Sequence, residues 1–590
     1  MDLKKITLLS AALLLLVSCG GGSTTGDGGG DGDLESVVAP TLDPSGGTFD
    51  EPQAITIATT TEGATIYYTT DGTDPTSSSN EYTEQVTIST DSTIKAIAVK
   101  SGMTDSDISS GSYIFHLVPQ FAVSMSSGED YSFYNGVFAT DSGVYAVGYV
   151  NGDAQFDLGN DKTITGDVLL SHNLLIAKYN TSGVPQWVNS VEPAAGESSY
   201  TGVSASGSGV YEVGALGQAG TYYLRDDDDD ANDVTAWSTY SGNNFLIVKY
   251  NTDGVAQLAN TVAGHAGGMG SDAPSSSTAY GVSAVGPSVY VVGEINGTEE
   301  FDFGNDIEPQ GSSIDNNALI IKYDSYLSAL FANTVSGGGG NPSVFKGVSA
   351  TSDDVYAVGF INGTTAFGFG NSITATGGFA GDNAVIAKYD ATGETQWVNS
   401  VSGGDDYSRF DAVSVGEDGV YAVGVINGTG TFDFGNDIAV TGIYDGENAV
   451  IVKYNADGEA QWAKSLTTTE EETVFRGVSV GEDGIYAVGY IYDTDTFDFG
   501  DGITVDGACM PEVKDVVIVQ YDADGTTLWA KTASGPDIER AEFNGVSTYN
   551  QTVFAIGVLG GVELPLNFGN EIETSGIHAS GSILLVGYSE

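Results

Sequence analysis

The chain has 590 residues, of which 79 are aspartate or glutamate and only 18 are lysine or arginine, so its formal net charge is −61. A surface of this charge repels phosphate backbones, which excludes nucleic acid as a natural partner and opposes direct docking on anionic lipid. The length is sufficient for two large hydrophobic cores.

Residues 1–18 have the features of a lipoprotein signal peptide. A basic start precedes the apolar run 6–17, which is too short to be a comfortable transmembrane helix. The segment 16–19, Leu-Val-Ser-Cys, resembles a lipobox, in which Cys19 is acylated and becomes the mature N-terminus. The alternative is an ordinary secretory peptide with a chance cysteine. Gly20 after the cysteine resembles outer-membrane sorting, so we expect a lipid anchor in the cell envelope, in the outer membrane or at the cell surface.

Residues 19–37 are rich in Gly, Ser, Thr and Asp. This composition cannot bury a core and behaves as a flexible linker. Acylation of Cys19 leaves only Cys509, so no internal disulfide can form.

Residues 38–116 are predicted to form a separate small domain. The segment 64–70, Ala-Thr-Ile-Tyr-Tyr-Thr-Thr, is a strand, the turn-forming sequence at 71–76 ends it, and 93–99 alternates again. These phrases resemble the chitobiase/β-hexosaminidase C-terminal-like domain, a small immunoglobulin-like β-sandwich of glycosidases and surface proteins. The resemblance implies a spacer or accessory domain, and carbohydrate binding does not transfer with it, because fold does not fix function.

Residues 117–590 contain a repeat. A short apolar phrase ending in Gly, such as Val-Tyr-Ala-Val-Gly at 144–148, occurs seven times at nearly regular spacing. Each unit carries four strand-like segments joined by Gly-rich turns and no helical periodicity, which is typical of a propeller blade. The last unit has only three such segments, whereas 120–124 matches a fourth segment such as 186–190 and has no partner of its own. The N-terminal strand is therefore expected to complete the last blade, since an open edge exposes unpaired backbone groups.

The predicted fold is all-β: a seven-bladed β-propeller with N-terminal strand closure, preceded by a small immunoglobulin-like β-sandwich. The alternative is an open array or two smaller bodies. The phrases Val-Tyr-Ala-Val-Gly, Phe-Asp-Phe-Gly and Lys-Tyr…Asp-Gly…Gln-Trp resemble the bacterial β-propeller repeats often labelled SBBP. That resemblance implies an extracellular or envelope protein and does not imply a ligand.

One position of each innermost strand varies and includes charged residues. It lies just before the Gly-Val-Ser phrase or its variants, at Asn135, Thr201, Tyr280, Lys346, Asp411, Arg476 and Asn544. These residues predict either a mixed-charge ring at one mouth of the central channel or an ordinary solvated rim.

Calcium is the one cofactor that the residues suggest. The Phe-Asp-Phe-Gly phrases place carboxylates on the outward face of a short strand, with further oxygen ligands nearby. The candidate ligands are Asp302, Asp433 and Asp498. The alternative is a solvated face with hydrogen bonds inside a turn.

The second unit carries two insertions, in links that should emerge on one face of a propeller. Carboxylates beside aromatic residues there suit Ca²⁺-assisted binding of sugar or peptide, whereas the alternative is a disordered acidic loop. The candidate ligand-binding residues are Asp226, Asp227, Asp228, Asp229, Asp230, Trp237 and Tyr240.

We predict a lipid-anchored envelope protein that is not an enzyme and that presents its propeller to carbohydrate or to an envelope protein. The four histidines share no repeat position, and near-identical blades offer no unique catalytic constellation. The alternatives are a carbohydrate-active enzyme, a lyase or glycosidase that uses loop carboxylates, and an envelope assembly scaffold.

Overall fold

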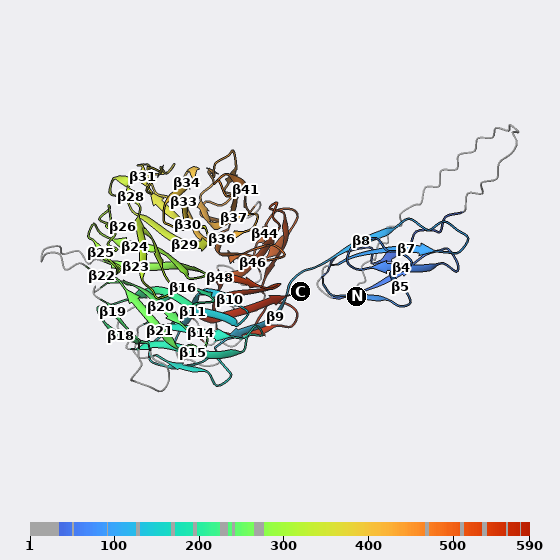
Figure 1. Cartoon of the computed structure of the whole chain (residues 1–590), viewed down its shortest axis with the longest axis horizontal. Helices are drawn as coiled ribbons and strands as arrows, with labels where there is room; N and C mark the ends of the chain where they lie inside the picture. Colours follow the sequence, from blue (N-terminus) through green and yellow to red (C-terminus); the bar gives the residue numbers. More distant parts are fainter. Residues whose placement is uncertain are drawn as a thin grey trace, which may run out of the picture. The chain divides into compact units, whose positions relative to one another are not determined.

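The computed structural model describes residues 35–49, 52–90, 92–125, 130–166, 172–192, 198–224, 234–238, 242–264, 276–466, 471–507, 513–533, 540–561, 565–576, 578 and 580–589. These residues form two compact units, one ending at Phe115 and the other beginning at His116. Strands make up most of both units (Figure 1). Within the described ranges no helix is long and apolar enough to cross a membrane.

The first unit consists of two sheets that enclose one core. In β7, alternate side chains are buried, including Ile94, Ala96 and Ala98. This period-two pattern is that of a strand with one face on a core, and it confirms the expected β-sandwich-like domain. One sheet contains β1 (Thr41–Asp43), β3 (Gln53–Ala58) and β6 (Val86–Ile88); the other contains β2 (Gly47–Phe49), β8 (Ser109–Phe115), β7 (Ser92–Val99), β4 (Thr65–Thr69) and β5 (Asn80–Glu81).

In the second unit the described residues form seven antiparallel sheets built on four strands each. The first strands are β10 (Ser132–Thr140), β16 (Ser199–Ser206), β23 (Ser276–Val285), β29 (Ser343–Ala350), β36 (Ser408–Gly416), β42 (Thr473–Val480) and β48 (Arg540–Tyr549). The second strands are β11 (Gly143–Asn151), β17 (Gly209–Leu216), β24 (Ser288–Asn296), β30 (Asp354–Asn362), β37 (Gly419–Asn427), β43 (Ile485–Tyr492) and β49 (Thr552–Gly560). The third strands are β14 (His172–Tyr179), β20 (Asn244–Tyr250), β26 (Asn316–Tyr323), β33 (Asp382–Asp390), β40 (Glu447–Tyr454), β46 (Lys514–Tyr521) and β52 (Ser582–Ser589).

The fourth strand of the last sheet comes from the start of the unit. The fourth strands are β15 (Pro185–Glu192), β21 (Ala256–Thr261), β27 (Ala329–Thr334), β34 (Thr395–Ser400), β41 (Ala460–Ser465), β47 (Thr527–Thr532) and, in the last sheet, β9 (Val118–Ser124). Strand β9 pairs antiparallel with β52, with Val123 opposite Leu585. The expected pairing of the N-terminal strand with the last sheet is therefore present. The first strands of successive sheets contact one another, and β48 contacts β10, so the sheets follow one another around a ring (Figure 1).

The repeated apolar phrase is buried on both faces of its sheet. In β37, Tyr421 and Val423 belong to the core shared with the next sheet, whereas Val420 and Ala422 belong to the core shared with the previous one. A strand between two cores has no solvent face, which explains why the phrase is continuously apolar.

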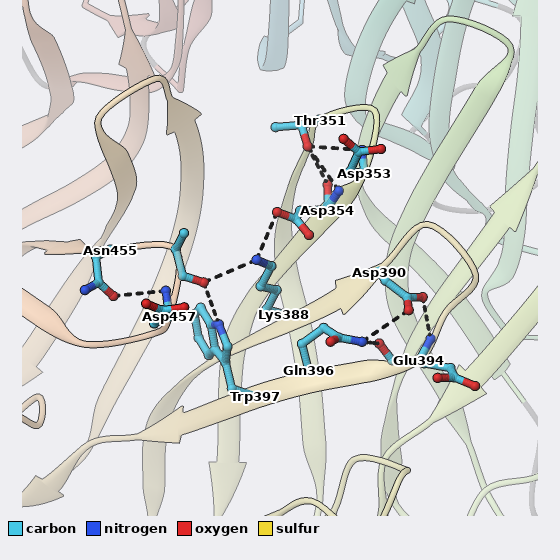
Figure 2. Close-up of polar contacts among 11 residues, drawn as sticks. Thr351, Asp353, Asp354, Lys388, Asp390, Glu394, Gln396, Trp397, Asn455 and Asp457 are labelled. Atoms are coloured by element: carbon cyan, nitrogen blue, oxygen red, sulfur yellow. Dashed lines mark hydrogen bonds and ion pairs between the residues drawn. The ribbon is translucent and has the colours of Figure 1, made fainter.

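Adjacent sheets are also joined by polar contacts (Figure 2). The ammonium group of Lys388 and the indole N–H of Trp397 both donate to the carbonyl oxygen of Ala456 in the next sheet, at 3.2 and 3.0 Å. Lys388 also forms a 2.9 Å ion pair with Asp354. These residues belong to the Lys-Tyr and Gln-Trp phrases of the repeat, whose role is therefore to join sheets.

Short hairpins occupy the links between second and third strands. They are β12 (Gln155–Asp157) with β13 (Thr163–Thr165), β18 (Gly220–Leu224) with β19 (Val234–Ser238), β31 (Phe367–Gly368) with β32 (Thr374–Ala375), β38 (Thr431–Asp433) with β39 (Ala439–Thr441), β44 (Thr496–Asp498) with β45 (Thr504–Asp506), and β50 (Leu566–Asn567) with β51 (Glu573–Thr574). Three further short strands that the structure describes lie in the segments that connect one sheet to the next. Strand β22 (Ala263–Gly264) pairs with β25 (Phe301–Asp302). Strand β28 (Ser336–Gly337) pairs with β31, and β35 (Ser402–Gly403) pairs with β38.

Candidate functional site

Every first strand has a β-bulge at the same point. In β10, Tyr134 pairs with Gly148 and Gly136 pairs with Val147, so Asn135 between them has no partner in the ladder. The same one-residue shift occurs in the other six sheets. A bulge bends the strand and re-aims a side chain. The bulged residues are Asn135, Thr201, Tyr280, Lys346, Asp411, Arg476 and Asn544.

These seven residues line a single cavity of about 600 Å³. The residues that follow them, Gly or Ala and then Val, line it too. All seven are half-buried. The seven variable positions therefore surround one cavity, three of them with charged side chains, and the choice between a functional ring and an ordinary solvated rim stays a prediction.

Glycine after the bulge allows the first strands to approach one another. A Cβ atom at Gly347 would lie 3.0 Å from the Cα of Ala412 and 3.1 Å from the carbonyl oxygen of Asp411 in the next sheet. A Cβ at Gly477 would lie 3.0 Å from the Cα of Gly545. Backbone therefore packs closely against backbone around the cavity, and small residues, Gly or Ala, occupy this position in every sheet.

Three consecutive positions of the ring hold neighbouring sheets together. The amide of Asn544 donates to the carbonyl oxygen of Tyr134 at 2.9 Å, and that of Asn135 donates to Tyr200 at 2.8 Å. The hydroxyl of Thr201 donates to the carbonyl of Ala279 at 2.8 Å. This part of the ring acts as a polar seam between sheets.

The next four positions form a different arc, which we call the charged arc: Tyr280, Lys346, Asp411 and Arg476, together with Arg409. Asp411 lies between the two guanidinium groups, 2.9 Å from Arg476 and 3.5 Å from Arg409. Arg409 also pairs with Glu447 at 2.7 Å. Two arginines and one carboxylate are thus concentrated on one side of the cavity.

Lys346 is held differently. Its ammonium lies 3.6 Å from the centre of the Tyr280 ring, and within the described ranges it has no hydrogen bond or ion pair to a carboxylate. Burial lowers the pKa of Lys346, and the nearby charges of Glu294 and Asp411 oppose that effect. Burial also raises the pKa of Glu294. The amine is therefore a half-buried cation that has no opposite charge in contact among the described residues.

Most of the sequence-predicted site residues lie outside the described residues. They are the lipidation site, Cys19, and the candidate ligand-binding residues Asp226, Asp227, Asp228, Asp229, Asp230 and Tyr240. Trp237 is described. It lies on β19 at the outer edge of the first sheet, because β18 pairs with β15. It does not line the central cavity, so the structure separates it from the charged arc.

Sequence reasoning missed a partner of Trp237. In the β18–β19 hairpin, Thr221 pairs with Trp237 and Tyr223 pairs with Thr235, so the two aromatic residues are diagonal neighbours on one face. Trp237 is 67% exposed and Tyr223 is 36% exposed. The other face, with Tyr222, is buried in the core. The alternation of Tyr222 and Tyr223 is the sequence signal that could have identified this pair.

The hairpin is held at both of its edges. Leu224 of β18 pairs with Val191 of β15 in the first sheet. On the other side, the hydroxyl of Thr261 in the second sheet donates to the carbonyl oxygen of Trp237. The aromatic face is therefore fixed before any ligand arrives.

Asp302, Asp433 and Asp498 each stabilise a turn. One carboxylate oxygen of each accepts the backbone N–H of the residue two positions later, at 2.7, 2.8 and 2.8 Å. Among the described residues, no group of three or more His, Cys, Asp or Glu is placed to hold a metal ion. The turn hydrogen bonds account for these carboxylates, and a calcium site there stays a prediction.

Two of the histidines, far apart in the sequence, lie near the same tyrosine, Tyr131. His172 stacks on Tyr149 with ring centres 4.0 Å apart, and its Nε2 lies 3.1 Å from the hydroxyl of Tyr131. His578 lies 6.5 Å from the same Tyr131 ring. The repeat could not reveal this cluster, because His578 lies in a link and His172 at the start of a strand of another sheet.

Comparison with known proteins identifies one region. Residues 44–110 match the family model of the chitobiase/beta-hexosaminidase C-terminal domain, which confirms the resemblance of the first domain. No curated protein matches the chain.

Solved structures match over most of the chain at low similarity. A quinonprotein alcohol dehydrogenase-like protein from Bacteroides thetaiotaomicron is 12% identical, with a TM-score of 0.21, over 74% of this chain and 95% of that chain. Rhamnogalacturonan lyase YesW is 11% identical, with a TM-score of 0.20, over 84% and 76%. A Bacillus licheniformis rhamnogalacturonan lyase is 9% identical, with a TM-score of 0.23, over 93% of each chain.

These comparisons correct one prediction. The sequence led us to exclude an enzyme, but two of the matching solved structures are lyases, so that exclusion does not stand. At these identities and TM-scores the likeness establishes no activity either.

Proposed function

We propose that this protein is a lipid-anchored component of the cell envelope that binds carbohydrate. In this proposal its seven sheets are the blades of a closed β-propeller, and the lipid on Cys19 holds it on the outer membrane or at the cell surface. The observation that carries the proposal is the pair of exposed aromatic side chains, Tyr223 and Trp237, on one face of the β18–β19 hairpin.

The chemistry of that face fits sugar. The flat C–H surfaces of a pyranose ring pack on aromatic rings, and Tyr and Trp combine an apolar body with a polar tip. Thr221 and Thr235 alternate with the two rings on the same face and supply hydroxyl groups for hydrogen bonds. The residues between β18 and β19, which include Asp226 to Asp230, connect directly to this face in the chain.

The experiment is a binding titration of purified protein against a panel of soluble polysaccharides and oligosaccharides. We expect Trp237→Ala to weaken binding by about 2 kcal/mol, as for a stacking aromatic at a binding centre, and Tyr223→Ala to weaken it less, since its ring is less exposed. Tyr326→Ala is the matched control, because Tyr326 is 77% exposed but lies in the turn between β26 and β27, in the third sheet's hairpin and away from β18–β19. Equal affinity in all four proteins, or capture of an envelope protein without any sugar bound, would refute the proposal.

A further inference from the structure

We infer that the charged arc is a second binding site, separate from the aromatic hairpin, and that it takes a carboxylated sugar, a uronic acid residue or a short oligomer containing one. The inference rests on the proposed function only in taking the ligand to be carbohydrate.

The first observation is the concentration of basic residues around the cavity. The chain has 79 acidic and 18 basic residues, yet the cavity is lined by three cations, Lys346, Arg409 and Arg476, and only two carboxylates. A second cavity, of about 1180 Å³, is lined by the turns between first and second strands. Like the chain as a whole, this second cavity is acidic. It is lined by Glu417, Asp418, Glu482, Asp483 and Asp522, and no lysine or arginine is among its described lining residues. The cations of the first cavity are therefore a specific feature of that site.

The second observation is that the cations keep unused hydrogen-bond donors. Within the described residues Arg476 donates one bond, from one terminal nitrogen to Asp411. A guanidinium has five N–H donors in a planar fork that matches a carboxylate. Lys346 has three donors, and among the described residues its ammonium lies over the Tyr280 ring and donates no hydrogen bond. An entering carboxylate would find donors on both sides of Asp411.

The third observation is energetic. A half-buried ammonium without an opposite charge in contact destabilises the free protein. A bound carboxylate beside Lys346 would remove that cost, so ligand binding and the burial of Lys346 support each other.

The fourth observation is size and polarity. Small-ligand sites commonly measure about 300–1,000 Å³, and this cavity of about 600 Å³ lies within that range. Its other wall carries Asn135, Thr201 and Asn544, whose side-chain oxygens can accept hydrogen bonds from hydroxyl groups. A small ligand with one carboxylate and several hydroxyls matches a cavity with cations on one side and amides on the other.

The test is a calorimetric titration of the purified protein with di- and trisaccharides that contain glucuronic or galacturonic acid, and with neutral glucose and galactose oligomers of equal length. We expect the acidic sugars to bind at least about tenfold more tightly than the neutral ones, the strength of one hydrogen bond between charged groups. Raising the salt concentration should weaken the binding of the acidic sugars more than the binding of the neutral ones.

The decisive variant is Lys346→Met. We expect it to lose the preference for acidic sugars and to melt at or above the temperature of the parent, since a buried charge is removed. Lys464→Met is the control, because it makes the same change in net charge. Lys464 lies on the outer strand β41 and forms an ion pair with Asp501. Equal binding of acidic and neutral sugars by the parent, or an unchanged preference in Lys346→Met, overturns the inference.

The two proposals can be refuted independently of each other. If neutral sugars bind and depend on Trp237 while acidic ones show no preference, the hairpin proposal stands and the charged arc does not bind uronates. If acidic disaccharides bind and depend on Lys346 but not on Trp237, the charged arc stands and the hairpin proposal is wrong. If no sugar binds, both are wrong.

Discussion

Trp397 and Gly458 lie in neighbouring sheets, and the glycine leaves room for the indole. A Cβ atom at Gly458 would lie 2.7 Å from the ring of Trp397, and the indole N–H donates to Ala456 in the same turn (Figure 2). The arrangement recurs with Trp187 over Gly254 and with Trp462 over Gly525. The Asp-Gly turns at 253–254, 457–458 and 524–525 therefore receive the tryptophan of the preceding sheet, and these tryptophans hold neighbouring sheets together.

This contact predicts the effect of removing the indole N–H. Trp397→Phe keeps an aromatic ring and loses the hydrogen bond to Ala456, which should lower the free energy of unfolding by about 1 kcal/mol. Urea unfolding measures the change, and Gln396→Ala on the exposed side of the same strand should stay within about 0.5 kcal/mol of the parent. A fully stable Trp397→Phe would mean that the hydrogen bond contributes nothing to the joint between sheets.

Glu212 is a carboxyl group in an apolar position. It is 0% exposed, neither carboxylate oxygen has a geometrically acceptable hydrogen bond within the described part of the chain, and the equivalent positions in other sheets are Ala146, Ala357 and Ala422. Burial raises the pKa of Glu212 well above its usual value, so the folded protein releases this proton at a higher pH than the unfolded chain does.

The sign of the pH effect follows. A carboxyl whose pKa is raised by folding stabilises the protein only at low pH, and this contribution is lost as the pH rises above the unfolded value of about 4.3. We expect the free energy of unfolding of Glu212→Gln to exceed that of the parent increasingly with pH, by about 1.4 kcal/mol per unit until the native group ionises. Chemical unfolding at pH 5 and pH 7 tests this; parallel pH profiles would contradict it.

Ring closure by β9 predicts a contrast between two truncated chains. A chain that begins at residue 117 keeps β9 and its pairing with β52, whereas a chain that begins at residue 126 leaves β52 with an open edge. We expect the shorter chain to melt at a lower temperature and to self-associate, because unpaired backbone groups recruit other chains. Calorimetry and size-exclusion chromatography measure both effects. Equal melting and a monomeric shorter chain would show that β9 is dispensable.

Much of this architecture can be predicted from the sequence, because a repeat reports the same position many times. The seven bulged positions were found as one set for that reason. Arg409 was not, since it lies two residues before the bulge and no other sheet has arginine there. Tyr223 was also missed, because its hairpin departs from the Phe-Asp-Phe-Gly phrase of the repeat. The repeat thus locates the bulged positions of the charged arc, but it gives no information about residues that depart from it, such as Arg409 and Tyr223.

Anchoring through Cys19 predicts the location of a single variant. Cys19→Ala should lose the lipid and move from the membrane fraction to the soluble fraction, since the thiol is the acylated group. Fractionation and metabolic labelling with a fatty acid measure both changes, and Cys509→Ala is the matched control. A Cys19→Ala protein that stays with membranes after a salt wash would place the anchor elsewhere.

The acidic segment between β18 and β19 predicts a calcium effect on sugar binding. Residues 226–230 are five consecutive aspartates that follow Leu224 and precede Val234, so they are tied to the ends of the strands that carry Tyr223 and Trp237. Carboxylate oxygens are the ligands that Ca²⁺ prefers. A bound ion would also lower the repulsion among these charges next to the sugar face.

We therefore expect calcium to strengthen polysaccharide binding by the parent and to have no effect once the five aspartates are replaced by serine. Trp237→Ala should weaken binding whether calcium or a chelator is present, since the ring acts by stacking. Calorimetry with Ca²⁺ alone separates ion binding from sugar binding. Replacing Asp302, Asp433 and Asp498 by asparagine is the control, because an asparagine side chain can still accept each turn hydrogen bond. Calcium enhancement that survives the serine replacement and disappears in the control would move the calcium site to the turns.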